Sequence, residues 1–446
     1  MVLLAVLVIL TATFGRPFSK LGWEGSSIFV TELVLLAASA LAIGRLGVKR
    51  SLHLVTSRIP MIPLVVLWIA GAVAVFRGLS DFGASFTVDD VGLVEYSVLL
   101  PIVALVVSST DRLEVLLRAL VIGAIGGIIV FGVSDVAARI WGYAGNVVPL
   151  QGLASGLYMS LFVVWIASML AHRQALKWPY LALGGMAMVL IVLTTTRSVW
   201  VAGIASLGVV ALLAPRGRRL KSAIAVGLAV AVAGSAAYAV EAVYGKPLIF
   251  AEATGVVRGV AQADDGEEGD GGPATTATTA TTAEAANAHW RPAVWSELLT
   301  RSREAPILGA GFGRPMSFLW GERKYDFRDG LPGTGVDVSG PHNGFIEILY
   351  RMGIVGLAAT LALIAIAAWR VGPLLREGRL TDVARSRLVT MIGIFVAAAA
   401  LAFFSDALKG PYLAMFFWLP LGLLLVWPTL VDDGLDRSDD AESGVP

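Results

Sequence analysis

Twelve strongly apolar stretches recur along this 446-residue chain, and they constrain its fold more than any other feature. A helix that crosses the hydrocarbon core of a membrane needs about 20 mostly apolar residues, because its backbone polar groups must be satisfied within the segment. We therefore expect an all-α polytopic membrane protein with about 12 transmembrane helices. The predicted spans are 1–14, 27–46, 60–76, 92–109, 116–133, 151–170, 178–194, 197–214, 220–242, 344–369, 388–404 and 412–427. The first span is short, and we interpret it as a truncated or tilted helix rather than a removed signal peptide.

The composition agrees with this interpretation and excludes several classes of protein. Hydrophobic residues make up 57% of the chain and charged residues only 15%, which rules out an ordinary cytosolic enzyme. The 34 basic and 33 acidic residues leave a net charge of +1, so no global field favours nucleic acid as a partner. The chain contains no cysteine, which excludes a disulfide scaffold, a thiol nucleophile and a zinc-thiolate site.

The basic residues of alternate loops predict the orientation in the membrane. Seventeen Lys and Arg residues lie in or beside one set of loops and 6 lie in the other set. Cytoplasmic loops carry the excess of basic residues, so we assign the richer set to the cytoplasm. We therefore expect a multi-pass protein of the cell inner (plasma) membrane. Both of its termini face the cytoplasm, and its longest loop lies on the extracytoplasmic face.

These assignments divide the chain into four parts. Residues 1–242 form nine helices, residues 344–427 form three more, and residues 428–446 form an acidic cytoplasmic tail. The large extracytoplasmic loop covers residues 243–343, and its part 261–288 is a low-complexity tract rich in Ala, Thr and acidic residues, for which we expect disorder. After this tract, residues 290–308 have the pattern of an amphipathic helix, and the chain then stays polar and loop-like up to the tenth span.

Histidine and arginine residues on the extracytoplasmic side are the candidates for a reaction site. His342 follows a proline at a predicted helix entrance, where it can act as a general base or can simply cap the helix end. Arg197 lies between two apolar helices with almost no loop. Burying its charge there costs free energy unless the side chain faces water or a fixed anion. The alternative is that the side chain extends to the lipid headgroups. Arg291 begins the amphipathic helix near Trp295, and a solvated surface position is its alternative reading.

Other polar residues have simpler interpretations. Glu347 and Arg351 are four residues apart on a predicted helix, so we interpret them as a structural ion pair. Asp89 and Asp90 fall in a short external loop and are interpreted as solvated. The Gly-x-Gly-x-Gly sequence at 309–313 lacks a preceding strand, which argues against a nucleotide-binding fold. We find no metal-ligand spacing and expect neither a metal nor a cofactor.

The order of these elements resembles the O-antigen ligase and O-antigen polymerase family of bacterial membrane glycosyltransferases. The resemblance extends over nearly the whole chain through the twelve-span plan. The matching residues are Thr196-Arg197-Ser198, Arg291 with Trp295, Gly309 to Gly313, and His342-Asn343-Gly344 followed by Arg351, Gly353 and Gly356.

The resemblance implies a polyprenyl (undecaprenyl) diphosphate-linked glycan as donor, transferred to a glycan or lipid acceptor without nucleotide or metal. Arginine binds phosphate oxygens through a planar, permanently charged fork, so Arg197 and Arg291 are expected to bind the diphosphate. His342 is expected to accept the proton of the attacking hydroxyl, which predicts inversion, and Trp295, Asn343, Glu347 and Arg351 are expected to support the site.

Three alternatives to a ligase stay open from the sequence. A polymerase would join lipid-linked repeat units with the same residues. A secondary transporter also commonly has twelve helices, although its charged residues usually lie near the middle of the membrane. A scaffold that binds envelope polymers without chemistry would leave His342 dispensable.

Overall fold

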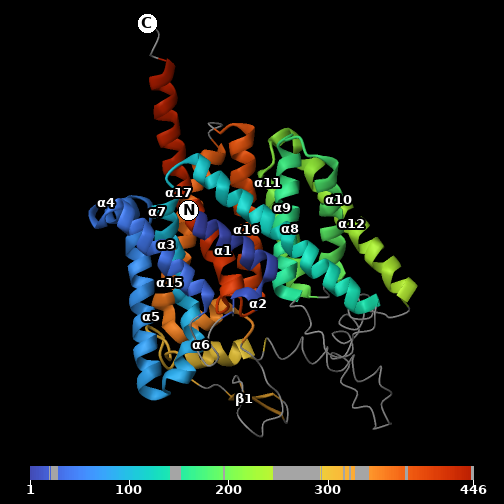
Figure 1. Ribbon diagram of the computed structural model, residues 1–446. Helices are drawn as coiled ribbons and strands as arrows, with labels where there is room; N and C mark the ends of the chain where they lie inside the picture. The colour runs from blue at the N-terminus through green and yellow to red at the C-terminus, as the bar shows by residue number, and fades with distance from the viewer. Residues whose placement is uncertain are drawn as a thin grey trace, which may run out of the picture.

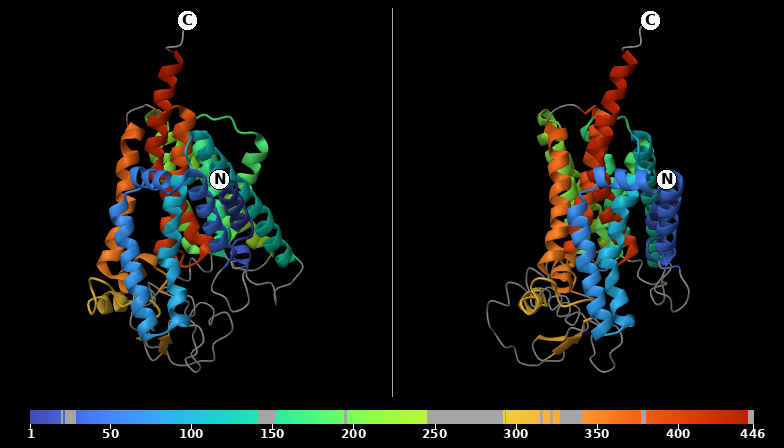
Figure 2. Two further views of the ribbon diagram at one scale, coloured as in Figure 1. Left: turned by 60° about the vertical axis from the view of Figure 1, so that its left-hand side comes forward. Right: turned by 90° about the vertical axis from the view of Figure 1, so that its left-hand side faces the viewer.

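The protein is a bundle of helices that run roughly along one axis in the computed structural model (Figure 1, Figure 2). The structure describes residues 1–19, 21, 29–140, 152–193, 196–244, 292, 294–314, 317–320, 323–326, 341–376 and 380–442. Its helices are α1 Val2–Phe14, α2 Arg16–Ser19, α3 Val30–Leu46, α4 Val48–Arg58, α5 Met61–Asp81, α6 Ala84–Glu95, η1 Tyr96–Val98, α7 Leu99–Val106, α8 Thr110–Ile140, α9 Gly152–Ala171, α10 Trp178–Leu193, α11 Arg197–Leu213, η2 Arg216–Arg218, α12 Arg219–Tyr244, α15 Gly344–Arg376, α16 Asp382–Phe404 and α17 Pro411–Glu442.

Every predicted span coincides with helical structure, which confirms the helical part of the prediction. The range 92–109 alone is divided, among α6, η1 and α7. Five helices of the described chain are long and apolar enough to cross a membrane, or six if α3 and α4, bent by 111°, form one span. The shorter apolar helices include α1 and α10. The helices therefore support an integral membrane protein, and the number of twelve spans stays a prediction.

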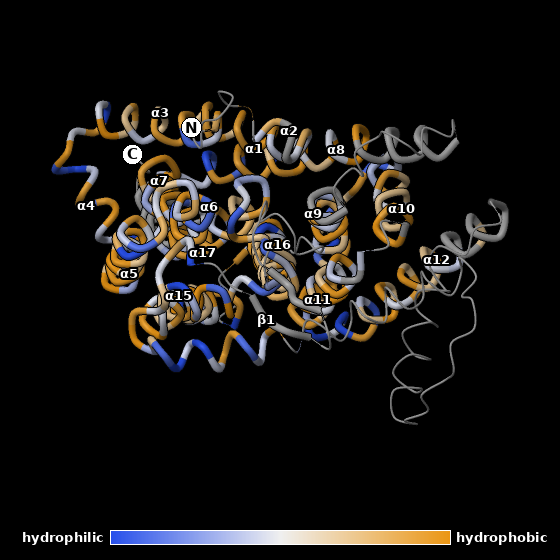
Figure 3. Tube along the Cα trace, turned by 90° about the horizontal axis from the view of Figure 1, so that it is seen from below, coloured by the Kyte–Doolittle hydropathy of each residue, from blue (hydrophilic) through white to orange (hydrophobic). Residues whose placement is uncertain are grey.

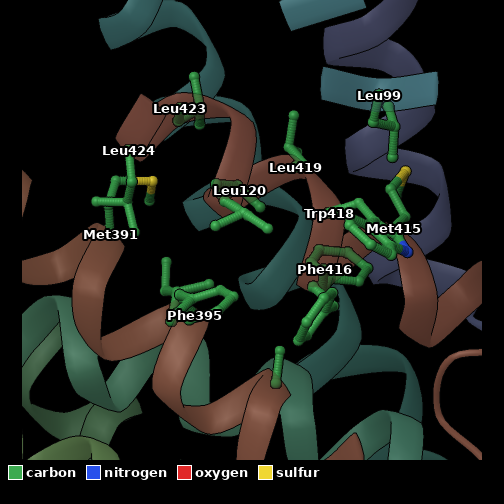
Figure 4. Packing of buried hydrophobic residues seen from close by; sticks show 14 of the residues in the cluster. Leu99, Leu120, Met391, Phe395, Met415, Phe416, Trp418, Leu419, Leu423 and Leu424 are labelled. Atoms are coloured by element: carbon green, nitrogen blue, oxygen red, sulfur yellow. The ribbon is translucent and has the colours of Figure 1, made fainter. Parts of the chain in front are cut away.

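Helix α17 lies at the centre of the apolar core. Figure 3 views the bundle along its axis and shows α17 surrounded by α6, α7, α15 and α16. Trp418 and Leu419 of α17 are fully buried, and they belong to one cluster with Leu99 of α7, Leu120 of α8 and Phe395 of α16 (Figure 4). This continuous apolar core fixes the ends of α15, α16 and α17 relative to one another, and those ends carry the candidate site.

The loop between α12 and α15 differs in two respects from the prediction. The helix predicted for 290–308 ends earlier than expected, since its last helical residue is 302 and turns follow. The stretch predicted to be loop-like contains a hairpin, in which β1 Ser317–Trp320 pairs antiparallel with β2 Arg323–Asp326. Aromatic residues favour strands, and each strand carries at least one of them. The low-complexity tract 261–288 lies outside the described residues.

The two ends of the bundle carry different parts of the chain. The hairpin and the helical residues 294–302 lie at the lower end in Figure 1, whereas α1 begins and α17 ends toward the upper end. Helix α17 continues to Glu442, so most of the predicted acidic tail is helical. The termini and the candidate site residues described next are therefore at opposite ends of the bundle.

Candidate active site

His342 lies directly before α15, where the chain enters the bundle from the large loop. Its φ of 49° is in the left-handed region, an uncommon conformation for a residue with a side chain. The backbone N–H of His342 donates to Oδ1 of Asp406 at 2.8 Å, and its Nδ1 lies 3.8 Å from Oδ2 of the same carboxylate. The imidazole is 25% exposed. The structure thus fixes the backbone of His342 and leaves part of its ring accessible.

Trp295 forms a hydrogen bond with Pro341, the residue before His342. Its indole Nε1 donates to the carbonyl oxygen of Pro341 at 2.8 Å, and its ring packs edge-on against Phe403 near the end of α16, with centroids 5.8 Å apart. The loop helix is therefore attached both to the entrance of α15 and to α16. This contact gives the predicted supporting residue Trp295 a definite place beside His342.

Asn343 caps the N-terminus of α15. Its Oδ1 accepts from the backbone N–H groups of Phe345 at 3.1 Å and Ile346 at 3.0 Å, the geometry that makes Asn a favoured N-cap. The side chain is fully buried, and its Nδ2 has no hydrogen-bond partner among the described residues. Asn343 therefore determines where α15 begins and, with it, the position of His342.

Three buried charged residues and one partly buried lysine lie behind this entrance, and we call them the buried tetrad: Asp90, Glu347, Arg351 and Lys409. Asp90 contacts Lys409 Nζ through Oδ1 at 2.8 Å and Arg351 Nε through Oδ2 at 3.1 Å. Lys409 also pairs with Glu347, while Arg351 Nε lies 3.9 Å from the same Glu347 oxygen. The tetrad thus pairs two carboxyl side chains with two cationic side chains, in keeping with the rule that buried charges are paired.

The charges of the tetrad stabilise one another. Burial acts to raise the pKa of Asp90, but Lys409 and Arg351 outweigh it, so this pKa lies below its ordinary value of 3.8. Burial likewise acts to lower the pKa of Lys409, but Asp90 and Glu347 outweigh it and raise this pKa above its ordinary value. These contacts therefore keep Asp90 ionised and Lys409 protonated near neutral pH.

One short turn connects the tetrad to His342. Residues 405–410 join α16 to α17, and they carry both Asp406 and Lys409, with the N–H of Lys409 bonded to the carbonyl oxygen of Asp406 at 3.1 Å. Asp406 holds His342, and Lys409 holds Asp90 and Glu347. The same turn therefore contacts both His342 and the tetrad.

The Gly-x-Gly-x-Gly sequence docks onto a break in α15. At Gly353 the helix is interrupted by a φ of 68°, and the exposed backbone groups on both sides pair with the loop. The N–H of Ile354 donates to Pro306 O at 2.8 Å, and Gly311 N–H donates to Arg351 O at 3.0 Å. The residues that pair with α15 here, such as Pro306, therefore lie in the turns that follow the last helical residue, 302.

Further bonds attach this turn to α5 and α6. Arg77 of α5 donates to Gly309 O at 2.7 Å, and Phe312 N–H donates to Ala74 O at 3.0 Å. Gly313 N–H donates to Asp90 at 2.7 Å, and Arg351 donates to Arg314 O at 2.8 Å. The glycine-rich turn is thus a structural clamp that joins three helices around the tetrad.

The two arginines predicted to bind diphosphate have different outcomes. Arg197 is the first residue of α11, and the structure describes its backbone. It lies at the site's end of the bundle, since neighbouring Val199 packs against Gly156 of α9, and Tyr158 of α9 donates to Tyr412 O at the start of α17. Arg291 lies outside the described residues.

Three residues of the site were not predicted from the sequence: Asp90, Asp406 and Lys409. Asp90 was interpreted as part of a solvated loop, but it is only 3% exposed and pairs with Arg351 and Lys409, so that interpretation is wrong. The predicted Glu347–Arg351 contact exists at 3.9 Å, although Asp90 is the nearer partner of Arg351. The signal for Asp406 and Lys409 was available: two opposite charges occupy a short turn between long apolar helices.

Comparison with known protein families gives a match over a region that contains part of this site, including His342, Glu347 and Arg351. Residues 181–361 match the family model described as O-antigen ligase. This range includes α11, the glycine-rich turn, His342 and the first half of α15, and it supports the family predicted from the sequence. No match is found among curated proteins.

Proposed function

We propose that this chain, whose residues 181–361 match the O-antigen ligase family model, is a membrane protein of glycan assembly. In this proposal it transfers a glycan from a polyprenyl diphosphate to a hydroxyl acceptor. The observation that carries the proposal is the arrangement at His342. A partly exposed imidazole is fixed at its backbone by Asp406, and the turn that carries Asp406 also carries Lys409 of the buried tetrad.

The proposed reaction uses His342 as the general base. The acceptor oxygen attacks the anomeric carbon and forms the new glycosidic bond, while the bond from this carbon to the diphosphate oxygen breaks. The hydroxyl proton passes to His342, and the electron pair of the broken bond leaves with the polyprenyl diphosphate. The Asp406 carboxylate, 3.8 Å from Nδ1, stabilises the imidazolium that results. Attack from the face opposite the leaving group inverts the anomeric configuration.

Fixed cations are proposed to receive the charge of the leaving group. Negative charge grows on the bridging oxygen as the bond breaks, and arginine forks are suited to diphosphate oxygens. Arg197 and Arg291 are the proposed diphosphate ligands, in keeping with their places in the matched region. Since Arg351 is occupied by Asp90 and by backbone carbonyls, its proposed role is to support the site.

A reconstituted assay tests this proposal. Purified protein is incubated with a polyprenyl-diphosphate glycan and separate acceptors, and the products are separated by mass. A new conjugate on a different acceptor indicates a ligase, whereas a longer lipid-linked chain indicates the polymerase alternative. Activity that persists in EDTA supports transfer without a metal.

His342→Ala is the decisive variant in this assay. We expect a loss of about 100-fold or more, the usual contribution of a general base. His53→Ala is the matched control, because His53 is an exposed histidine on α4. Transfer by correctly inserted His342→Ala protein at the parent rate would reject the assignment.

A further inference from the structure

A second polar region lies at the end of the bundle opposite His342. There α3 ends at Leu46, and the chain bends by 111° into α4 at Gly47, which has a φ of 77°. Helix α4 lies across the helix ends rather than along them (Figure 1). Its Val48 and Leu52 are 72% and 60% exposed, and the same helix carries Lys49 and Arg50. A short helix with exposed apolar and basic residues suits the headgroup layer of a membrane.

A cavity of about 610 Å³ opens beside this bend, and we call it the arginine cavity. Helices α1, α3, α4, the end of α7 and the start of α8 contribute to its walls. Its basic residues are Arg45, Arg50, Arg58 and Arg112. Apolar side chains such as Leu41 line the rest, and no acidic residue is among the described residues around it. The cavity is therefore positively charged on one side and apolar on the other.

Backbone carbonyls hold two of these arginines in place. Arg58 is 6% exposed and donates to Ala104 O at 3.2 Å and Val107 O at 2.8 Å. Arg112 donates to Val106 O at 3.1 Å. A carbonyl orients a guanidinium without cancelling its charge, so the positive potential of the cavity persists.

The other two arginines are available to a ligand. Arg45 lies in the last turn of α3 and Arg50 in the first turn of α4, so the bend at Gly47 brings them to the same cavity. Both side chains are exposed, and neither forms a hydrogen bond or ion pair with any residue that the structure describes. Uncompensated arginines around a preformed cavity favour an anion that can accept several N–H groups.

We propose that the arginine cavity binds the phosphate headgroup of an anionic phospholipid, with the acyl chains against the apolar wall. Three observations support this ligand class: the arginines match phosphate, the apolar lining matches lipid chains, and α4 suits the headgroup level. The site is separate from the proposed glycosyl transfer, because it lies at the other end of the bundle.

Lipid binding by the full-length protein tests this inference. The protein is delipidated in a neutral detergent, and its affinities for phosphatidylglycerol and phosphatidylcholine are measured by native mass spectrometry and by thermal shift. We expect phosphatidylglycerol to bind more tightly and to raise the unfolding temperature. Arg45→Gln/Arg50→Gln is expected to weaken phosphatidylglycerol binding about 30-fold, since each arginine near an anionic headgroup contributes roughly fivefold.

Two matched variants and a phosphate titration complete the experiment. Arg45→Lys/Arg50→Lys keeps both charges and is expected to retain most of the binding. Lys177→Gln/Arg216→Gln removes two exposed basic residues outside the cavity and is expected to leave binding unchanged. Equal phosphatidylglycerol affinity in the Gln variant and the parent would overturn the site. Stabilisation by sodium phosphate equal to that by phosphatidylglycerol, or equal binding of phosphatidylcholine, would overturn the lipid as its ligand.

Discussion

Asp406 accepts the backbone N–H of His342 at 2.8 Å, and its other carboxylate oxygen lies 3.8 Å from Nδ1 of the same histidine. One carboxylate thus fixes the position of the proposed base and places a negative charge beside it. The residue comes from the turn between α16 and α17, 64 positions along the chain. Asp406 is therefore a positioning residue of the proposed reaction.

Asp406→Asn separates these two effects. The amide oxygen can still accept from His342, but the negative charge is lost, so we expect kcat to fall by about 10- to 100-fold with little change in KM for the donor. The acidic limb of the pH–rate profile should also move to lower pH, because the imidazolium loses its neighbouring anion. Asp81→Asn, at an exposed acid, is the control. An unchanged profile would contradict the role of the charge.

Removing Lys409 should destabilise the protein strongly. Lys409→Met leaves Asp90 and Glu347 with Arg351 as their remaining cation in the buried tetrad, and we expect a loss of about 3–5 kcal/mol. The double variant Lys409→Met/Glu347→Gln leaves one carboxylate, Asp90, paired with one cation, Arg351. It should therefore unfold at a higher temperature than the single variant. Thermal unfolding in detergent measures both.

Arg118→Met is the comparison for this pair of variants. Arg118 pairs with Glu114 on α8, but its side chain is 72% exposed, so its loss should cost at most about 1 kcal/mol. If the double variant were less stable than Lys409→Met alone, charge balance would not explain the tetrad.

The break in α15 should not tolerate a side chain. A Cβ at Gly353 would lie 2.2 Å from Ile307 O, and its φ of 68° disfavours other residues, so Gly353→Ala should release the glycine-rich turn and cost about 1–3 kcal/mol. Gly208→Ala in α11 meets no atom within 4 Å and should be neutral or slightly stabilising. Hydrogen exchange at residues 306–313 measures the release. Unchanged protection in Gly353→Ala would show that the clamp does not depend on this glycine.

Asp90 should make stability depend on acidic pH. Its pKa is lower in the folded protein than its ordinary value of 3.8, so its contribution is present above that value and is lost as the pH falls toward the lowered pKa. The unfolding temperatures of the parent and Asp90→Asn should therefore differ most near neutral pH and converge below about pH 4. A difference that stays constant with pH would assign the effect to packing.

Much of the fold follows from local sequence. Apolar stretches of membrane-spanning length predict helices such as α5 and α15 without any knowledge of their neighbours, because each helix satisfies its own backbone. The start of α15 at Gly344 was also predictable, since Pro341 and Asn343 are local signals of a helix entrance. The hairpin was missed, because a pair of four-residue strands gives little periodic signal.

The sequence by itself determined that the chain is rich in apolar helices and in which order its motifs follow one another, and this order led to the family resemblance and to the prediction of His342 as the base. Only the tertiary structure decided which charges meet. Asp90 and Lys409 lie in segments far apart along the chain, and packing of α6 and α17 in one core brings them into contact at 2.8 Å. Burial then turns an aspartate that looks solvated into a structural anion, because a charge removed from water must have a fixed partner.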